Sequence, residues 1–263
     1  MKKLLCILSA CLYTVSYSYA EDINLVADDK VEWYQNEQKM VAVGNAVASK
    51  KDMNIRADKM TGYYSSYRVN GQDKTGISTV HAEGNVKMHS PKADGFGDTM
   101  DYDVAAETVV LKGRPAKIKT EKETITATES ITYYPNKQQA IALGEVIASN
   151  NANKIYSNKM VSYFSKNQQG NLEMDRVEIF DNVKIVSKDA VVTAEKGLYL
   201  PKESMVKLFN NVVIEQDGNI LKGDMAETNL DTGVSKLLTK KSSGKRVTGV
   251  FKEKSKSNKE KKQ

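Results

Sequence analysis

The sequence predicts an all-β protein in which about six antiparallel hairpin repeats stack side by side. Apolar and polar residues alternate with a period of two along much of the chain, which is typical of half-buried strands. One strand motif also recurs six times, with turn-forming residues between its copies. Outside the first 20 residues no stretch sustains the 3.6-residue period of a helix. We therefore expect about 14 to 18 short strands and no helix in the body.

The first 20 residues have the layout of a secretory signal peptide. Two lysines precede an apolar run, 4–15, and the small residues Ser18 and Ala20 predict cleavage after Ala20. The apolar run is shorter than the roughly 20 residues that a membrane-spanning helix needs. Two other interpretations stay open: an uncleaved anchor, and a lipobox at 8–11 that ends in an acylated Cys11. Each of them exports the rest of the chain.

The recurrent strand motif has the pattern apolar-x-apolar-x-Gly-Asn-apolar-x-apolar. Residues 40–48 and 80–88 are its clearest copies, and altered copies are centred on residues 113, 144, 181 and 210. Asp181 and Asn210 stand where the other copies have Gly. The centres lie 29 to 40 residues apart, a spacing typical of a protein built from repeated supersecondary units.

A second kind of segment alternates with the first. It consists of a small residue, then a polar residue, and a few residues later an aromatic residue. The chain begins and ends with this type of segment, although the last copy lacks its aromatic. The copies are Ala27-Asp28 with Trp33, Ala57-Asp58 with Tyr63, Gly97-Asp98 with Tyr102, Ala127-Thr128 with Tyr133, Ser157-Asn158 with Tyr163, Ala194-Glu195 with Tyr199, and Gly223-Asp224.

Turn-forming residues separate the strands. They occur at 70–71, 135–136, 169–171, 201–202, 217–219 and 231–233. Two repeats are longer than the others, and we expect inserted loops there, at 65–78 and 165–176.

Charge divides the chain into a body, 21–234, and a basic tail, 235–263. Residues 236–263 contain 11 Lys or Arg against two Glu, whereas residues 21–235 carry 26 basic and 31 acidic groups. The tail has too few apolar residues to offset its ordering entropy, so we expect it to be disordered. It either contacts anionic lipid head groups or is simply solvated. We expect no nucleic acid partner, because an exported protein seldom meets one and the tail offers no aromatic stacking platform.

The inward-facing positions of the predicted strands are mostly Ala, Val, Ile and Met. Such strands must bury their apolar face against each other. Either two sheets close tightly into an ordinary sandwich core, or they leave a space that something apolar can occupy. A β-solenoid without a ligand is a further alternative, although the uneven spacing and the hairpin-type turns favour antiparallel strands.

These features resemble the OstA-like family of periplasmic lipopolysaccharide transport proteins, whose type member is LptA and whose relatives include LptC and the N-terminal part of LptD. The resemblance rests on Ala-Asp segments with a downstream Tyr, on Gly-Asn-Val strands such as 82–86, and on the leader; it covers most of residues 22–233. It implies a twisted OstA-like β-jellyroll with an apolar trough for the acyl chains of lipopolysaccharide (lipid A). It also implies a periplasmic location and head-to-tail pairing of edge strands with other copies and with LptC-like and LptD-like jellyrolls. An inner-membrane-anchored LptC-like protein is the alternative within the family.

Carried over by position, the resemblance implies a trough lined by the inward-facing residues of the repeated motif. The predicted lipid-binding residues are Ala42, Ala46, Val80, Ala82, Val86, Met88, Leu111, Ala142, Val146, Ile179, Val183, Ile185, Leu208, Val212 and Ile214.

The sequence offers little for catalysis. Both cysteines, Cys6 and Cys11, lie in the predicted leader, so the exported chain has no thiol. The two histidines, His81 and His89, fall on the polar face of one strand and are too far apart to share a metal. No phosphate-binding loop, nucleophile elbow or zinc-binding helix motif occurs. We therefore expect neither an enzyme nor a cofactor or metal site.

Overall fold

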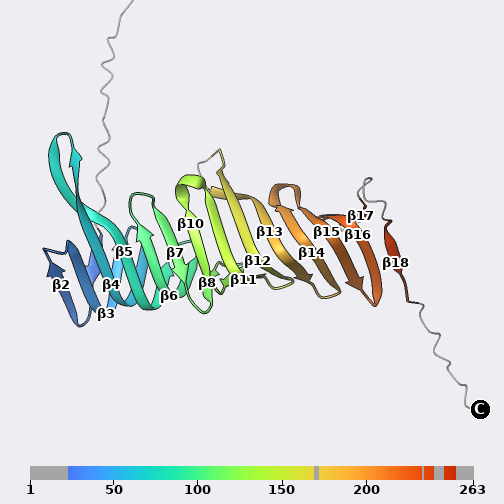
Figure 1. Ribbon diagram of the computed structural model, residues 1–263, viewed down its shortest axis with the longest axis horizontal. Helices are drawn as coiled ribbons and strands as arrows, with labels where there is room; N and C mark the ends of the chain where they lie inside the picture. The colour runs from blue at the N-terminus through green and yellow to red at the C-terminus, as the bar shows by residue number, and fades with distance from the viewer. Residues whose placement is uncertain (1–22, 169–171, 233, 240–245, 253–263) are drawn as a thin grey trace, which may run out of the picture.

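The chain forms one long stack of strands (Figure 1). The structure, a computed structural model, describes residues 23–168, 172–232, 234–239 and 246–252. The strands are β1 Asn24–Val26, β2 Lys30–Tyr34, β3 Lys39–Lys50, β4 Met53–Val69, β5 Gln72–His89, β6 Asp94–Asp103, β7 Thr108–Lys112, β8 Ala116–Lys119, β9 Thr124–Ala127, β10 Ser130–Tyr134, β11 Gln139–Ser149, β12 Lys154–Lys166, β13 Leu172–Val186, β14 Ala190–Leu200, β15 Met205–Gln216, β16 Asn219–Asn229, β17 Ser235–Leu238 and β18 Thr248–Val250. Two short 3-10 turns, Pro135–Lys137 and Pro201–Glu203, occupy two of the predicted turns.

All strand pairings of the described residues are antiparallel, which confirms the predicted all-β hairpin stack. Strands at successive positions pair with each other, so order in the chain is order along the stack. Four positions hold two short strands in place of one long strand: β1 with β2, β7 with β8, β9 with β10, and β17 with β18. The described part of the stack therefore has fourteen strand positions and, at about 4.8 Å per position, a length of about 60 Å.

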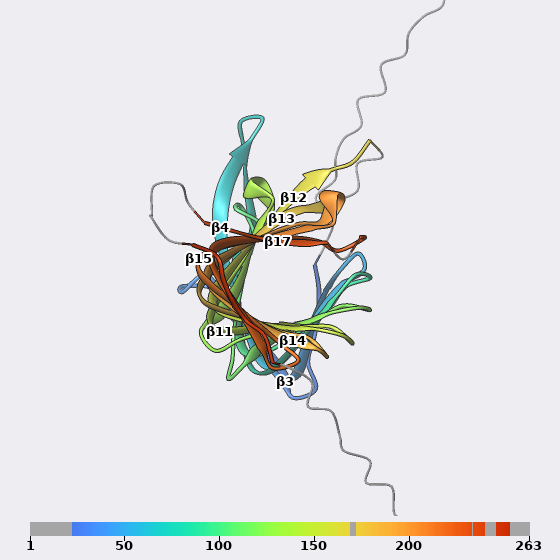
Figure 2. The ribbon, with the colours of Figure 1, turned by 90° about the vertical axis from the view of Figure 1, so that its right-hand side faces the viewer.

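Each long strand of the first motif changes direction at the Gly-Asn pair. Gly84 and Asn85 have φ angles of 79° and 48°, and Gly44 and Asn45 have 86° and 41°. The pairing register shifts at the same points, as it does in a β-bulge. We call the line of these kinks the crease. In the view along the stack, the strands fold over at the crease, so that the two ends of each long strand lie in two different sheets (Figure 2). Sheet 1 contains β2, β7, β10 and β17, sheet 2 contains β1, β8, β9 and β18, and the long strands contribute to both.

The copies without Gly keep the same backbone shape. Asp181 and Asn182 have φ angles of 60° and 56°, and Asn210 and Asn211 have 64° and 50°. Asp and Asn are the side chains that best tolerate this left-handed region. The substitutions at 181 and 210 therefore preserve the kink.

The second motif supplies the partner surface at the crease. Its small residue faces an apolar residue of the first motif, as in the pairs Ala46 with Ala57 and Val86 with Gly97, which lets the backbones approach closely. Its polar residue holds the kink, because the Asn85 amide donates a hydrogen bond of 2.8 Å to the Asp58 carboxylate. The same bond joins Asn45 to Asp28 and Asn211 to Glu195. The two sequence motifs are thus two sides of one structural feature.

The core runs without interruption along the crease. One cluster of buried residues extends from Ala42 to Ala116 and a second from Ala127 to Ala226. Ile131 packs against both clusters, so the two halves of the stack share a continuous apolar interior.

The prediction of inserted loops at 65–78 and 165–176 is wrong. Residues 65–69 continue β4 and pair with residues 72–76 of β5, and β12 and β13 extend in the same way as far as Lys166 and Leu172. Asn70 and Gly71 both have positive φ, as the tight hairpin turn requires. Both extensions are mostly polar, and their larger apolar residues such as Tyr67 and Leu172 are exposed, so turn geometry and cross-strand pairing maintain them rather than burial.

The expectation of a disordered tail fails for its first part. Residues of β17 and β18 lie inside 235–263, yet both strands pair with the edge of β16, and Leu237 packs against the core. The exposed edge of β16 supplies backbone partners that composition alone does not reveal. Residues 253–263, like the predicted leader, lie outside the described residues. No helix long and apolar enough to cross a membrane occurs in the described ranges.

Candidate lipid-binding trough

The inward-facing side chains form four rows that run along the stack. Because cross-strand partners point to the same face, each row can be followed from strand to strand through the pairing register. Two rows, which we call the crease rows, flank the crease, one on each sheet. The mouth row of sheet 1 and the mouth row of sheet 2 lie one inward position further from the crease. None of the residues in these rows is Asp, Glu, Lys, Arg or His.

Burial falls from the crease towards the mouth. In the crease rows Ala42, Ala46 and Val146 are fully buried, and Met60, in the same row as Ala42, is only 2% exposed. In the mouth rows most apolar side chains pack against these buried clusters but are only partly buried, and Trp33 at the end of the stack is 65% exposed. The sheets therefore close on each other at the crease and separate away from it, which makes the interior a trough with an apolar lining.

The structure places all fifteen predicted residues on the inward face but at two depths. Eleven lie in the crease rows and are at most 6% exposed: Ala42, Ala46, Ala82, Val86, Leu111, Ala142, Val146, Ile179, Val183, Leu208 and Val212. Four lie in the mouth rows and are partly exposed: Val80, Met88, Ile185 and Ile214. The four are therefore accessible from inside the trough, whereas the eleven form its floor.

Sequence reasoning missed most of the mouth. The mouth row of sheet 2 is aliphatic and includes Ile55, Ile118, Ile125, Ile155 and Val192 beside the predicted Ile185 and Ile214. These residues lie in second-motif segments or short strands, outside the repeated Gly-Asn motif. In the sequence these apolar residues alternate with polar ones, as in 154–156 and 117–119, and this alternation could have identified them as inward-facing.

The mouth row of sheet 1 differs because it carries aromatic residues. Tyr102 and Tyr133 flank Val109 on neighbouring strands. Burial raises the pKa of both phenols, and the nearby Glu107 carboxylate raises it further. Both hydroxyls therefore stay protonated over the physiological range and remain hydrogen-bond donors.

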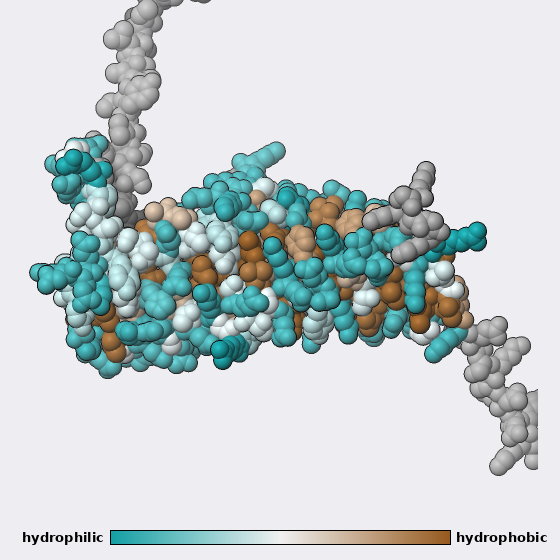
Figure 3. All heavy atoms as spheres, viewed as in Figure 1, coloured by the Kyte–Doolittle hydropathy of each residue, from teal (hydrophilic) through white to brown (hydrophobic). Residues whose placement is uncertain are grey.

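The outer surface is mostly polar over the first half, and apolar side chains gather over the second half in the face seen in Figure 3. Along one outward row of sheet 1, Leu143, Phe180 and Phe209 alternate with Lys159 and Lys196. The Lys159 ammonium lies over the Phe180 ring, 5.5 Å from its centroid. The stem of Lys159 can thus cover part of this half-buried ring.

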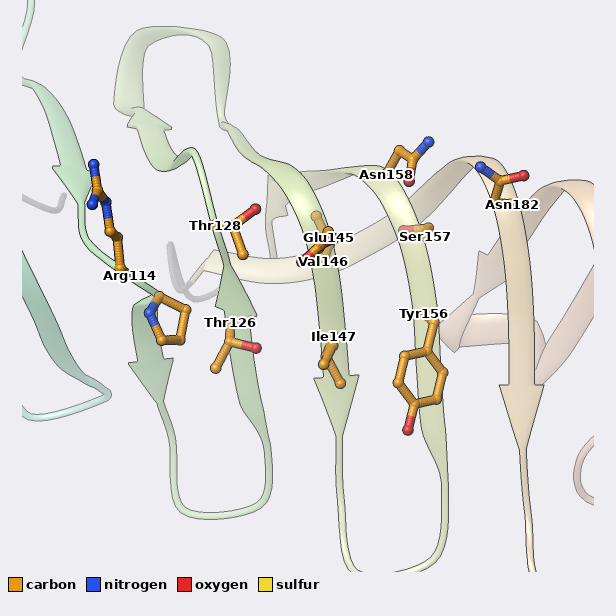
Figure 4. A pocket seen from close by; sticks show the side chains of 11 residues that line it. Arg114, Thr126, Thr128, Glu145, Val146, Ile147, Tyr156, Ser157, Asn158 and Asn182 are labelled. Atoms are coloured by element: carbon orange, nitrogen blue, oxygen red, sulfur yellow. The ribbon is translucent and has the colours of Figure 1, made fainter.

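A shallow hollow also lies on the outer face. Thr126, Ile147 and Tyr156 line it side by side on adjacent strands, next to the break between β7 and β8 at Arg114 (Figure 4). The inward neighbours of these residues belong to the trough, so the hollow faces away from it. It offers no cluster of His, Cys or carboxylates, and none of the described residues forms such a cluster.

The histidines are separate in space as well as in sequence. His81 Nδ1 lies 2.6 Å from Asp101 Oδ1, and His89 Nδ1 lies 2.6 Å from Asp94 Oδ1. Each ring is thus engaged by its own cross-strand carboxylate on the outer face.

The two halves of the stack repeat each other. Met60 and Met160 occupy equivalent crease positions, and the kink at Gly44 recurs at Gly144, in both cases 100 residues apart. The pattern of the family described as "LptA/(LptD N-terminal domain) LPS transport protein" accordingly matches the chain twice, at residues 25–139 and 129–234. Each match covers one half of the stack.

Other comparisons add less. No curated protein matches the chain. Among solved structures, this chain is similar to LptH, the LptA homologous periplasmic component of the lipopolysaccharide transport device from Pseudomonas aeruginosa. The identity is 15% and the TM-score 0.44, and the match covers 50% of this chain and 95% of LptH. Because the two family matches together extend from residue 25 to residue 234, this chain belongs to the LptA/LptD N-terminal domain family of lipopolysaccharide transport proteins.

Proposed function

We propose that this protein shields the acyl chains of lipopolysaccharide in its trough and that its two edges pair with related jellyrolls to form a bridge between the inner and outer membranes. The single observation that supports the trough most strongly is the gradient of burial. Apolar side chains face inward along the whole stack, and those furthest from the crease remain partly exposed. An ordinary sandwich core would bury both of its rims.

An acyl chain gains free energy on leaving water for any apolar surface, whatever family the protein belongs to. Each CH₂ group moved from water to an apolar surface gains about 0.8 kcal/mol, so a chain of 12 to 14 carbons gains on the order of 10 kcal/mol. The mouth rows offer such a surface over about 60 Å, without an intervening charge. A passing acyl chain therefore meets a similar environment at every strand, which favours movement along the trough over tight binding at one place.

The edges of the stack support the bridging part of the proposal. At one end Val26, Val31 and Trp33 are 55%, 51% and 65% exposed, and at the other end Val250 and Phe251 are 66% and 70% exposed. Within the described ranges, β2 pairs only with β3, and β18 only with β16. Exposed edge strands with apolar side chains are suited to adding a strand from another chain. We infer that β1 and β2 of one molecule pair with β17 and β18 of the next, or with the edge of an LptC-like or LptD-like jellyroll.

A substitution at the mouth tests the trough. Ile185→Asp places a carboxylate where acyl chains would lie, and because this position is partly exposed the charge can reach water without unfolding the protein. We expect lipopolysaccharide binding to weaken by at least about tenfold, or 1.4 kcal/mol. Val186→Asp is the matched control, because Val186 is the next residue of β13, is similarly half-buried and points outward. Equal affinities for the two variants, with both folded by circular dichroism, would contradict the proposed trough.

The pairing of edges is tested by size. Sedimentation of the purified protein over a wide concentration range should show assemblies that grow head to tail, and Val31→Asp together with Val250→Asp should reduce them to monomers. A protein that stays monomeric at all concentrations and does not bind a partner jellyroll would exclude the pairing.

Mass spectrometry of the exported protein tests its location, because a mature chain that begins at Glu21 supports a soluble periplasmic carrier and one that begins at Met1 supports an anchored protein.

A further inference from the structure

The aromatic residues of the second motif have a shared place in the fold that the proposed function does not explain. On six alternate strand positions an inward-facing aromatic lies at or next to the mouth row of sheet 1. No residue of the opposite mouth row is aromatic. We call this set the aromatic lip; its members are Trp33, Tyr64, Tyr102, Tyr133, Phe164 and Tyr199.

The aromatic lip is built twice with the same geometry. Trp33 and Tyr64 meet edge to face, with centroids 5.9 Å apart and planes at 83°. Tyr133 and Phe164, each 100 residues later, meet with centroids 6.3 Å apart and planes at 82°. In such a pair the ring that presents its edge keeps both of its faces free of the partner. The halves therefore contain two equivalent aromatic sites rather than one irregular stripe.

These rings are not ordinary core residues. Trp33 is 65% exposed, and the other members are partly buried, in contrast to the crease residues beneath them. Within the described chain the hydroxyls of Tyr102, Tyr133 and Tyr199 make no hydrogen bond, whereas the outward-facing Tyr163 bonds to Glu178 at 3.3 Å. The lip thus presents apolar ring faces together with hydroxyls that are available to a ligand at Tyr102, Tyr133 and Tyr199, whereas the Tyr64 hydroxyl accepts a hydrogen bond of 2.7 Å from the Trp33 indole N–H.

An amphiphile in the trough would meet two different edges. On sheet 2 the mouth is aliphatic and suits acyl chains alone. On sheet 1 each tyrosine has an apolar body and a polar tip, which is the character that places Tyr and Trp at boundaries between apolar and wet surroundings. Sugars match this surface, because their C–H faces pack on aromatic rings while their hydroxyls accept or donate hydrogen bonds.

We propose that the aromatic lip binds the saccharide head group of a glycolipid whose acyl chains occupy the trough, with one such site in each half of the chain. This inference rests on the proposed function and adds a specificity to it: the head group is held at one edge while the chains lie below. Trp33 with Tyr64 forms the centre of the first site, and Tyr133 with Phe164 forms the centre of the second.

Two probes with the same 12-carbon chain test the proposal: dodecyl maltoside, which has a sugar head, and dodecanoate, which has none. Calorimetry on the full exported chain, below the critical micelle concentration, should show two dodecyl maltoside molecules bound per chain. Trp33→Leu should remove one of them and Tyr133→Leu the other, and the double variant should bind dodecyl maltoside at least about tenfold more weakly. The affinity for dodecanoate should change less than about twofold.

The controls separate the lip from the trough. Tyr63→Leu changes the outward-facing tyrosine next to Tyr64, which is 45% exposed, and should leave both affinities unchanged. Tyr133→Phe keeps the ring and should retain most of the binding, and it also preserves the test if Tyr133→Leu does not fold. Equal losses for both probes, or no loss for either, would overturn the saccharide site while the trough stands. Failure of the unmodified protein to bind either probe would overturn the proposed function and this inference together.

Discussion

The kink at Gly84 is the point at which the fold depends most directly on a single backbone conformation. Gly84 has a φ of 79°, and a Cβ atom built on it would lie 2.4 Å from the Asp58 carboxylate oxygen that accepts the Asn85 amide. Gly84→Ala therefore both places an L-residue in the left-handed region and displaces Asp58 from its hydrogen bond. We expect the variant to fold but to be less stable.

Two effects lower the free energy of unfolding of Gly84→Ala. A non-glycine residue in the left-handed region costs about 1–2 kcal/mol, and the lost hydrogen bond costs about 1 kcal/mol. Together they lower the free energy of unfolding by about 2–3 kcal/mol, which at about 2–4 °C per kcal/mol for a body of this size lowers the Tm by about 8 °C. Thermal unfolding followed by circular dichroism measures the change.

The equivalent position of a later copy supplies the control. Asp181 has a φ of 60°, and its side chain makes no hydrogen bond within the described chain, so Asp181→Gly relieves the same conformational cost and should keep or raise the Tm. A Gly84→Ala variant with the Tm of the unmodified protein, or an Asp181→Gly variant that lost as much stability as Gly84→Ala, would refute the conformational cost assigned to the kink.

Three further predictions concern the core, the crease and the surface. Met60→Ala, at a side chain that is 2% exposed, should lower the free energy of unfolding by about 2–5 kcal/mol in a urea titration. Asn85→Gly keeps the kink but removes the amide, and should cost about 1 kcal/mol by the same measurement. The hydrogen bond and charge of Lys202 lower the pKa of Asp175. The contribution of this pair to stability is therefore present above the ordinary pKa of Asp and is lost as the pH falls through the lowered pKa of Asp175. In an NMR titration the Asp175 midpoint should rise in Lys202→Met; an unchanged midpoint would show that the ion pair does not form in solution.

Local pattern accounts for the parts of this protein that the sequence predicts well. The period of two assigns each residue of a strand to the inward or the outward face, and all fifteen predicted trough residues indeed face inward. The recurrence of Gly-Asn, with Asp and Asn as the tolerated replacements, marks the crease because few residues adopt the left-handed region. These features depend on neighbours in the chain, so the amino-acid order alone fixes them.

Depth in the trough was decided by the tertiary structure. Val183 and Ile185 have the same parity on one strand, yet Val183 is 1% exposed at the crease and Ile185 is partly exposed at the mouth, because the opposite sheet approaches only near the kink. The pairing of β17 and β18 with β16 likewise depends on an edge that the rest of the stack creates. The sequence therefore determined which face is apolar, whereas the distance between the two sheets, a property of residues far apart in the chain, decided where a ligand can reach it.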